Sequence, residues 1–130
     1  MSPRLLILIL FFSYPFGTIG NGASSRMKVT RYTYLLTLND RKRHEHVIEQ
    51  GRVIRFMVQF ETFVEGKWLP VIRYDTAHGF PHVDRTLPDG TIEKIPLLTK
   101  DLGEALTFAD QDIDENRQRY KEVYLKERRQ

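Results

Sequence analysis

Between residues 52 and 64 the chain alternates apolar and polar side chains, and this pattern constrains the fold more than any other stretch. One face of the run RVIRFMVQFETFV carries Ile54, Phe56, Val58, Phe60 and Val64. The other face carries Arg55, Gln59 and Glu61. A period of two belongs to a β-strand, because successive strand side chains point to opposite faces of a sheet. The stretch therefore predicts a long strand with one face in a core and the other largely in water.

Further strands are predicted on both sides of this run. The segment KVTRYTYLLTLN at residues 28–39 is rich in Val, Thr and Tyr, as strands are. The glycine turn at Gly66 leads into a strand over residues 68–74, so the two runs form a hairpin. The turn LPDGT separates short strands near residues 82–87 and 91–95. Val47 and Ile48 before Gly51 suggest another short strand that turns into the long one.

The last third of the chain predicts a helix. Asp101 followed by Glu104 resembles a capping box at a helix start. Apolar residues then recur at helical spacing as far as Tyr124. The expected fold class is therefore α+β: a small antiparallel meander of about five strands with one long C-terminal amphipathic helix packed on one face. We expect a single domain over residues 27–130.

Residues 1–26 differ from the rest of the chain and predict a hydrophobic leader. An apolar run extends from Leu5 to Phe12, and Pro15 and Gly17 follow it. The run is too short for a stable membrane span but has the parts of a signal peptide. The alternative is translated upstream sequence, with Met27 as the true start. The protein is then cytoplasmic, whereas a real signal segment makes it secreted or membrane-associated.

Charge and cysteine content limit the function classes. Residues 27–130 carry 18 basic and 17 acidic side chains, a balance that gives no general attraction to nucleic acid. The segment from Arg117 to Gln130 is locally basic, which is typical of a solvated helix end but also suits contact with phosphates. The chain has no cysteine, which excludes disulfides and thiolate metal sites.

The candidate site lies in the stretch VIRYDTAHGFPHVDRTLPDG, residues 71–90. An acid–base or metal site can be built there from Asp75, His78, His82 and Asp84, with Arg73 and Tyr74 as substrate-binding residues. The sequence requires no cofactor, although a divalent metal is compatible with these residues. The alternative is that Asp75 and His78 close the loop through hydrogen bonds to backbone amides.

Other candidate residues favour structural roles. The pair His44 and His46 fits two exposed strand residues better than a metal site. Trp68, Tyr74 and Phe80 offer a stacking surface for bases, but aromatic residues of a small sheet are more often core.

Two resemblances follow from these residues. The run GKWLPVIRYDTAHGFPHVD, with LPDG and EALTFADQDIDENRQRYKEVY after it, resembles a family of small uncharacterised prokaryotic proteins with a W-x-P-V-x-R-Y-D-T-A-H-G-x-x-H-x-D core. That likeness covers most of residues 28–125. The R-Y-D, H-G and following H elements are also similar to TumE-like proteins of toxin–antitoxin systems. The residues that carry this second likeness are Arg73, Tyr74, Asp75, His78, Gly79 and His82.

Two hypotheses of different classes remain. In the first, the protein is a toxin–antitoxin-related component that acts on nucleic acid, with His78 and His82 as acid and base or as metal ligands. In the second, it is a non-catalytic protein-binding or dimerisation module with a structural RYDTAHG loop. Clustered ionisable residues favour the first and the near-neutral net charge favours the second, so the sequence leaves open whether the protein is an enzyme.

Overall fold

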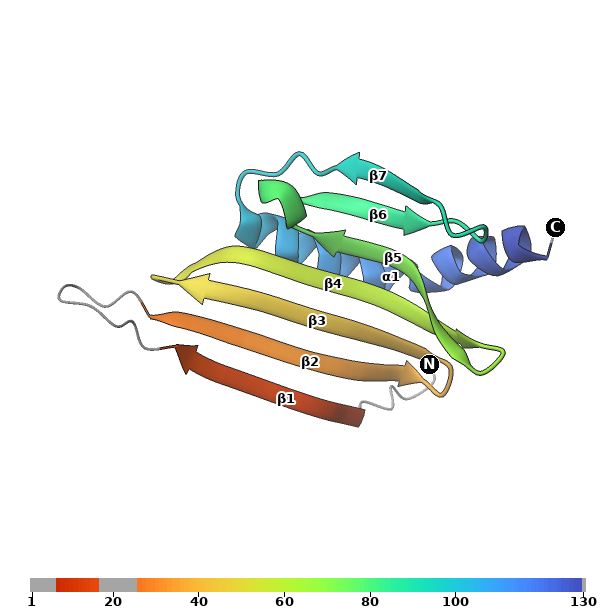
Figure 1. Cartoon of the computed structure of the whole chain (residues 1–130), viewed down its shortest axis with the longest axis horizontal. Helices are drawn as coiled ribbons and strands as arrows, with labels where there is room; N and C mark the ends of the chain where they lie inside the picture. The colour runs from red at the N-terminus through yellow and green to blue at the C-terminus, as the bar shows by residue number, and fades with distance from the viewer. Residues whose placement is uncertain (1–6, 17–25, 130) are drawn as a thin grey trace.

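The computed structural model describes residues 7–16 and 26–129, with only the backbone described for residues 7–16 and for His78. Seven antiparallel strands form one sheet in which each strand pairs with the next along the chain (Figure 1). The strands are β1 (Ile7–Phe16), β2 (Met27–Thr37), β3 (Asp40–Glu49), β4 (Arg52–Val64), β5 (Lys67–Asp75), β6 (His82–Thr86) and β7 (Ile92–Pro96). A 3₁₀ turn, η1 (Ala77–Gly79), joins β5 to β6, and the helix α1 (Leu102–Arg128) follows β7.

The predicted α+β meander with one C-terminal helix is confirmed, with six strands from Met27 onward where about five were expected. The main difference is β3, which is a full ten-residue strand rather than a short one around Val47 and Ile48. Its sequence is mostly charged and therefore lacks the apolar alternation that marks a strand. The strand forms because its charged side chains find partners on both faces of the sheet.

The segment Ile7–Phe16 forms β1, although its sequence predicts a leader outside the fold. It pairs antiparallel with β2, from Ile7 opposite Leu35 to Phe16 opposite Met27. Without β1, strand β2 would be an edge with free backbone hydrogen-bonding groups, and the extended segment Ile7–Phe16 satisfies these groups. Whether residues 1–26 are a signal peptide or lie upstream of the native start stays a prediction.

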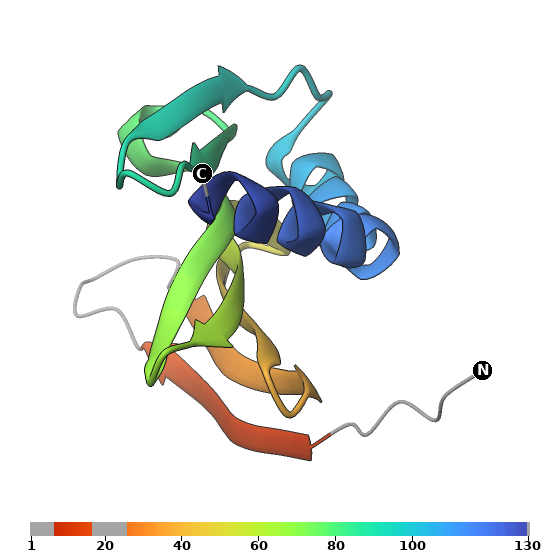
Figure 2. The same ribbon diagram turned by 90° about the vertical axis from the view of Figure 1, so that its right-hand side faces the viewer.

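Helix α1 lies against one face of the sheet and packs mainly on β4 and β5 (Figure 2). Its start is as predicted, because the Asp101 carboxylate accepts the backbone N–H of Glu104 at 2.8 Å. Ala105, Ala109 and Ile113 are fully buried against the sheet. Small alanine side chains let the helix backbone approach the strands closely, so the core is formed between α1 and the β4–β5 hairpin.

The pairing register assigns each side chain of β3 and β4 to a face. Lys42 lies opposite Phe60 and His44 opposite Val58, so these four side chains point toward α1. Arg41, Arg43 and Glu61 alternate with them and point to the other side of the sheet, which we call the open face.

The prediction that Gln59 and Glu61 lie in water is wrong. Both side chains are buried on the open face. Glu61 receives Arg41 at 2.5 Å and Arg43 at 3.5 Å, and it also accepts a hydrogen bond from Gln59. The arginines of β3 therefore cover the polar residues of β4, which sequence alternation within β4 alone does not reveal.

Within residues 7–16 and 26–129, no helix has the length and apolar content that crossing a bilayer requires.

Candidate functional site

Pairing of β5 with β6 gathers most of the predicted site residues on the open face. Asp75 lies opposite His82, and Arg73 lies opposite Asp84. Because these positions are two apart on each strand, all four side chains point to the same side of the sheet. We call these four residues the Asp75–His82 cluster. The side chain of His78 lies outside the described residues, and only its backbone, in η1, is placed.

His82 is the centre of the cluster. Its Nε2 lies 2.8 Å from Asp75 Oδ1 and 3.6 Å from Asp84 Oδ1. Its Nδ1 lies 3.1 Å from the Phe80 carbonyl oxygen, in the loop just before β6. The Phe80 carbonyl and the Asp75 carboxylate are therefore the groups closest to the imidazole nitrogens, and the Asp84 carboxylate lies farther away.

Asp75 connects the histidine to Arg73. Its Oδ2 accepts the Arg73 Nε–H at 2.5 Å, and its Oδ1 accepts the Ala77 backbone N–H at 3.0 Å. Burial raises the pKa of Asp75, but the Ala77 N–H, Arg73 and His82 together outweigh burial and bring it below the ordinary value. The carboxylate is therefore charged at neutral pH and binds the loop and the arginine at the same time.

Burial decides what this cluster can contact. The His82 side chain is 0% exposed, Asp75 is 8% exposed and Arg73 is 43% exposed. The Phe80 ring lies 5.5 Å from the His82 ring, centroid to centroid. A molecule that approaches the open face therefore meets the Arg73 guanidinium, and the groups behind it position that guanidinium.

A hollow of about 340 Å³ adjoins the cluster on the open face. Arg73 and Asp75 line it, together with Thr76 and Ala77 of the turn after β5. Glu45, Arg55, Phe56 and Met57 complete the lining. Two arginines, Arg55 and Arg73, therefore line the same hollow.

Arginines cover acids elsewhere on the open face in the same manner. Arg43 is 48% exposed, whereas its partner Glu61 is 5% exposed. Arg31 donates to Glu45 at 2.7 Å and is again the more exposed of the two. The acids thus lie beneath and the guanidinium groups lie outermost, which makes this face more cationic toward an approaching molecule than its formal charge indicates.

Two aromatic side chains lie at the turn between β4 and β5. The rings of Phe63 and Trp68 are 5.2 Å apart, and the Arg41 guanidinium lies 4.3 Å from the Trp68 ring centroid. Phe63 is partly exposed. Trp68 and Phe63 are thus only partly core, whereas Tyr74 points to the opposite face and does not join a common stacking surface with them.

Tyr74, predicted to bind substrate, lies in the core beneath α1. Its hydroxyl donates to Asp112, which also accepts the Tyr120 hydroxyl at 2.7 Å. Burial and the neighbouring Asp112 carboxylate raise the pKa of Tyr74 well above its ordinary value. The three side chains connect β5 to α1, and Tyr74 stands apart from the Asp75–His82 cluster.

A second polar group, the β3–α1 ion cluster, lies on the other side of the sheet. Lys42 binds Asp110 at 3.3 Å and Asp114 at 3.0 Å, and His44 Nδ1 lies 3.4 Å from Asp110. The expectation that His44 is exposed is wrong, because α1 covers it. Lys42 and His44 are two residues apart on a strand, and Asp110 and Asp114 are four residues apart on a helix, so each pair lies on one face of its element. This spacing could have indicated the cluster from the sequence.

Acid destabilises the fold through this cluster. Burial and the neighbouring His44 lower the pKa of His46 from 6.5, and His44 Nε2 lies 2.7 Å from His46 Nδ1. Burial raises the pKa of Asp110, but His44 and Lys42 outweigh burial and bring it below 3.8. For both groups the unfolded chain takes up a proton at a higher pH than the folded one. The free energy of unfolding therefore falls as pH drops below about 6.5, and falls again below about 4.

Urea denaturation at pH 7 and pH 5 tests the first of these steps. The His46→Gln protein should lose less stability than the wild type between the two pH values, because glutamine does not titrate. An equal loss in both proteins would contradict the assignment to His46.

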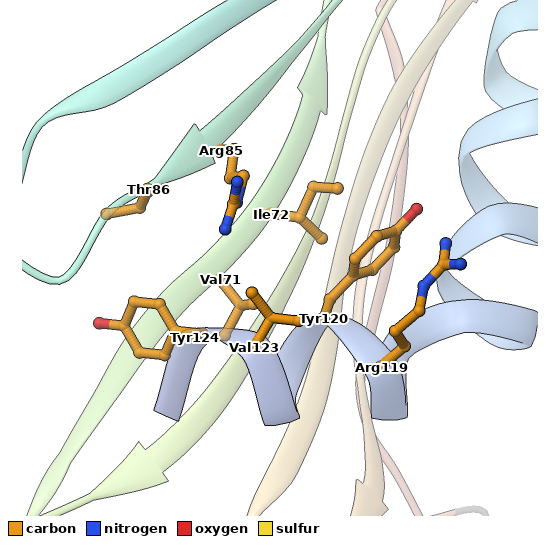
Figure 3. Close-up of a pocket in the computed structure, with 8 residues that line it drawn as sticks. All are labelled: Val71, Ile72, Arg85, Thr86, Arg119, Tyr120, Val123 and Tyr124. Atoms are coloured by element: carbon orange, nitrogen blue, oxygen red, sulfur yellow. The ribbon is translucent and has the colours of Figure 1, made fainter. Parts of the chain in front are cut away.

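A groove of about 300 Å³ lies between α1 and the β5–β6 pair, on the side of the sheet that faces the helix (Figure 3). Its interior is mostly apolar, and Arg85 at its edge donates to Glu127 at 2.8 Å. The lining residues are Val71, Ile72, Arg85, Thr86, Arg119, Tyr120, Val123 and Tyr124. The groove and the Asp75–His82 cluster are therefore on opposite faces of the sheet.

Comparison with known proteins identifies a family for most of the chain. The model for a domain of unknown function (DUF7718) matches residues 26–130. Neither a curated protein nor a solved structure matches the chain. The matched region contains β2 to β7 and α1, and hence the complete Asp75–His82 cluster.

Proposed function

The chain belongs to the DUF7718 family, a domain of unknown function, and on the geometry of the open face we propose that it binds single-stranded nucleic acid. The phosphodiester backbone contacts the exposed guanidinium groups of Arg31, Arg43, Arg55 and Arg73. Arginine suits this role because its planar fork of donors matches phosphate oxygens.

The proposal rests on one observation: on the open face, the arginines are more exposed than the acids with which they pair. Arg43 and Arg73 are nearly half exposed, while Glu61 and Asp75 are almost fully buried. Each buried acid fixes one side of its arginine and leaves other N–H groups of the guanidinium directed outward. The arginines are therefore pre-oriented, which reduces the side-chain entropy that binding costs.

The Asp75–His82 cluster has a positioning role in this proposal. Because His82 is fully buried, the phosphate is bound by Arg73, and Asp75 and His82 maintain its orientation. The aromatic rings of Phe63 and Trp68 offer stacking surfaces to bases. The likeness of the R-Y-D, H-G and H elements to TumE-like proteins is the ground for assigning this binding to a toxin–antitoxin-related component.

Fluorescence anisotropy with labelled single-stranded RNA and DNA tests the proposal on the full chain. Four phosphate contacts predict a slope of log Kobs against log salt of about −3, since each contact to a single strand contributes about −0.7. Binding that does not change with salt, or no binding at low salt, would contradict the proposal.

A second candidate, a homodimerisation module, is favoured by the β7 edge. Every residue of β7 is exposed, including Ile92 and Ile95, and Leu98 just beyond it is also exposed. Exposed apolar residues on an edge strand are typical of a surface that pairs with another chain. Sedimentation equilibrium separates the two candidates, because this one requires a concentration-dependent dimer that Ile95→Lys disrupts.

A further inference from the structure

The geometry points to a divalent-cation site formed by Asp75 Oδ1, His82 Nε2 and Asp84 Oδ1. One atom from each of these residues lies within 4.8 Å of the other two. This inference is independent of nucleic-acid binding, because it concerns what lies between the three side chains and not what the arginines contact.

The hydrogen-bonding capacity of His82 gives the first reason. The Phe80 carbonyl oxygen can only accept, so the His82 Nδ1 at 3.1 Å must carry the hydrogen. In a neutral imidazole Nε2 is then an acceptor. Its neighbour at 2.8 Å, Asp75 Oδ1, is an acceptor as well. Two acceptors at this separation require a positive species between them, which is either a second proton on the ring or a metal ion.

Asp84 favours the metal ion over the proton. Its Oδ1 is a buried atom and, within the described part of the chain, has no hydrogen-bond partner. It lies 3.6 Å from His82 Nε2 and 3.8 Å from Lys94 Nζ, both beyond hydrogen-bond length. A proton shared by His82 and Asp75 leaves this oxygen unsatisfied, whereas a cation bound by all three atoms satisfies it.

The spacing also agrees with metal coordination. Nitrogen and oxygen ligands lie about 2.0–2.2 Å from Zn²⁺, so neighbouring ligand atoms are about 3–3.6 Å apart. The separations of 2.8 and 3.6 Å at His82 Nε2 need only small adjustments. A metal-binding histidine typically donates its other N–H to a carbonyl or carboxylate, as His82 does to Phe80.

The ligand types indicate which cation fits. Imidazole favours Zn²⁺ and similar first-row ions, whereas Mg²⁺ and Ca²⁺ prefer sites made of oxygen alone. One imidazole with two carboxylates therefore selects Zn²⁺ over Mg²⁺ and Ca²⁺. Three protein ligands leave a further position for water on the side of Asp84, which is the more exposed of the two carboxylates.

Isothermal titration calorimetry of the full chain, freed of metal with a chelator, tests the inference with ZnCl₂, MgCl₂ and CaCl₂. The wild type should bind one Zn²⁺ per chain and bind Mg²⁺ and Ca²⁺ at least about tenfold more weakly. Asp84→Asn should weaken Zn²⁺ binding at least about tenfold, because it removes one charged ligand. The matched control is Asp89→Asn, at an exposed turn where asparagine can still accept from Thr91.

A second variant should strengthen Zn²⁺ binding rather than weaken it. Its result therefore tests the inference even if Asp84→Asn does not fold. Lys94→Gln removes the cation that competes for Asp84 and should strengthen Zn²⁺ binding about threefold. The inference is wrong if the wild type binds no Zn²⁺, or if Asp84→Asn and Asp89→Asn bind it equally well with intact circular dichroism spectra. Loss of Zn²⁺ binding in Lys94→Gln would also overturn it.

Discussion

Replacement of Phe60 by alanine should lower the free energy of unfolding by about 3–5 kcal/mol, measured by urea denaturation. Phe60 is 0% exposed and lies in the core cluster between β4 and α1. Truncation removes the ring from the interface that joins the helix to the sheet and leaves a cavity behind. Because a small domain has only about 5–15 kcal/mol of stability, the variant should be near its unfolding limit at 37 °C.

Phe63→Ala is the matched control for this prediction. Phe63 is on the same strand three residues later, but it points to the open face and is 41% exposed. Its truncation should cost less than about 1.5 kcal/mol. Similar losses for both variants would contradict the assignment of the two faces of β4.

The double substitution Arg43→Gln with Arg73→Gln should weaken binding of single-stranded nucleic acid by about tenfold, or about 1.4 kcal/mol. It should also reduce the salt slope by about 1.4, since two phosphate contacts are lost. Fluorescence anisotropy measures both effects. The fold should persist, because Arg41 still pairs with Glu61 and the Ala77 backbone N–H still binds Asp75.

Lys126→Gln with Arg129→Gln removes the same charge from the end of α1 and serves as the control. Both residues are exposed and lie in the basic C-terminal segment. This variant should bind within about twofold of the wild type, because nearby charge alone contributes little when salt is present. If it loses as much affinity as the open-face variant, the helix end is the binding surface.

Most of the fold could be predicted from local patterns. The alternation in β4, the turns at Gly66 and Gly90 and the Asp101 cap each act within a few residues, and each is found in the structure. The full length of β3 could not be predicted in this way. Its charged residues become a strand only through Glu61 on one face and the helix acids on the other, which are distant in sequence.

The sequence indicated which side chains could share a face of the sheet, but not how exposed they are. Spacing places Arg73 with Asp75 and His82 with Asp84, and the β5–β6 register then puts all four on one face. Tyr74 points to the other face. The same spacing does not reveal that His82 is fully buried, because burial depends on neighbours brought in by the fold, such as the Phe80 ring and the Asp75 carboxylate.

Arg31 and Arg43 were not identified from the sequence, for a related reason. The partners in the pairs Arg31–Glu45 and Arg43–Glu61 lie on neighbouring strands, so only the register of the sheet shows that the acids lie beneath the arginines. Net charge counts the arginine and the acid of each pair equally. It therefore does not show that the arginine is the more exposed of the two.

Nuclear magnetic resonance mapping of the bound surface tests the central claim most directly. Backbone amide and arginine Nε–H signals of the isotope-labelled full chain are followed while a short single-stranded RNA is added. The account predicts that the largest shifts occur at open-face residues of β2 to β5, with Arg43 and Arg73 among them. Shifts confined to α1 or to the groove at Val71 and Tyr124 would contradict it.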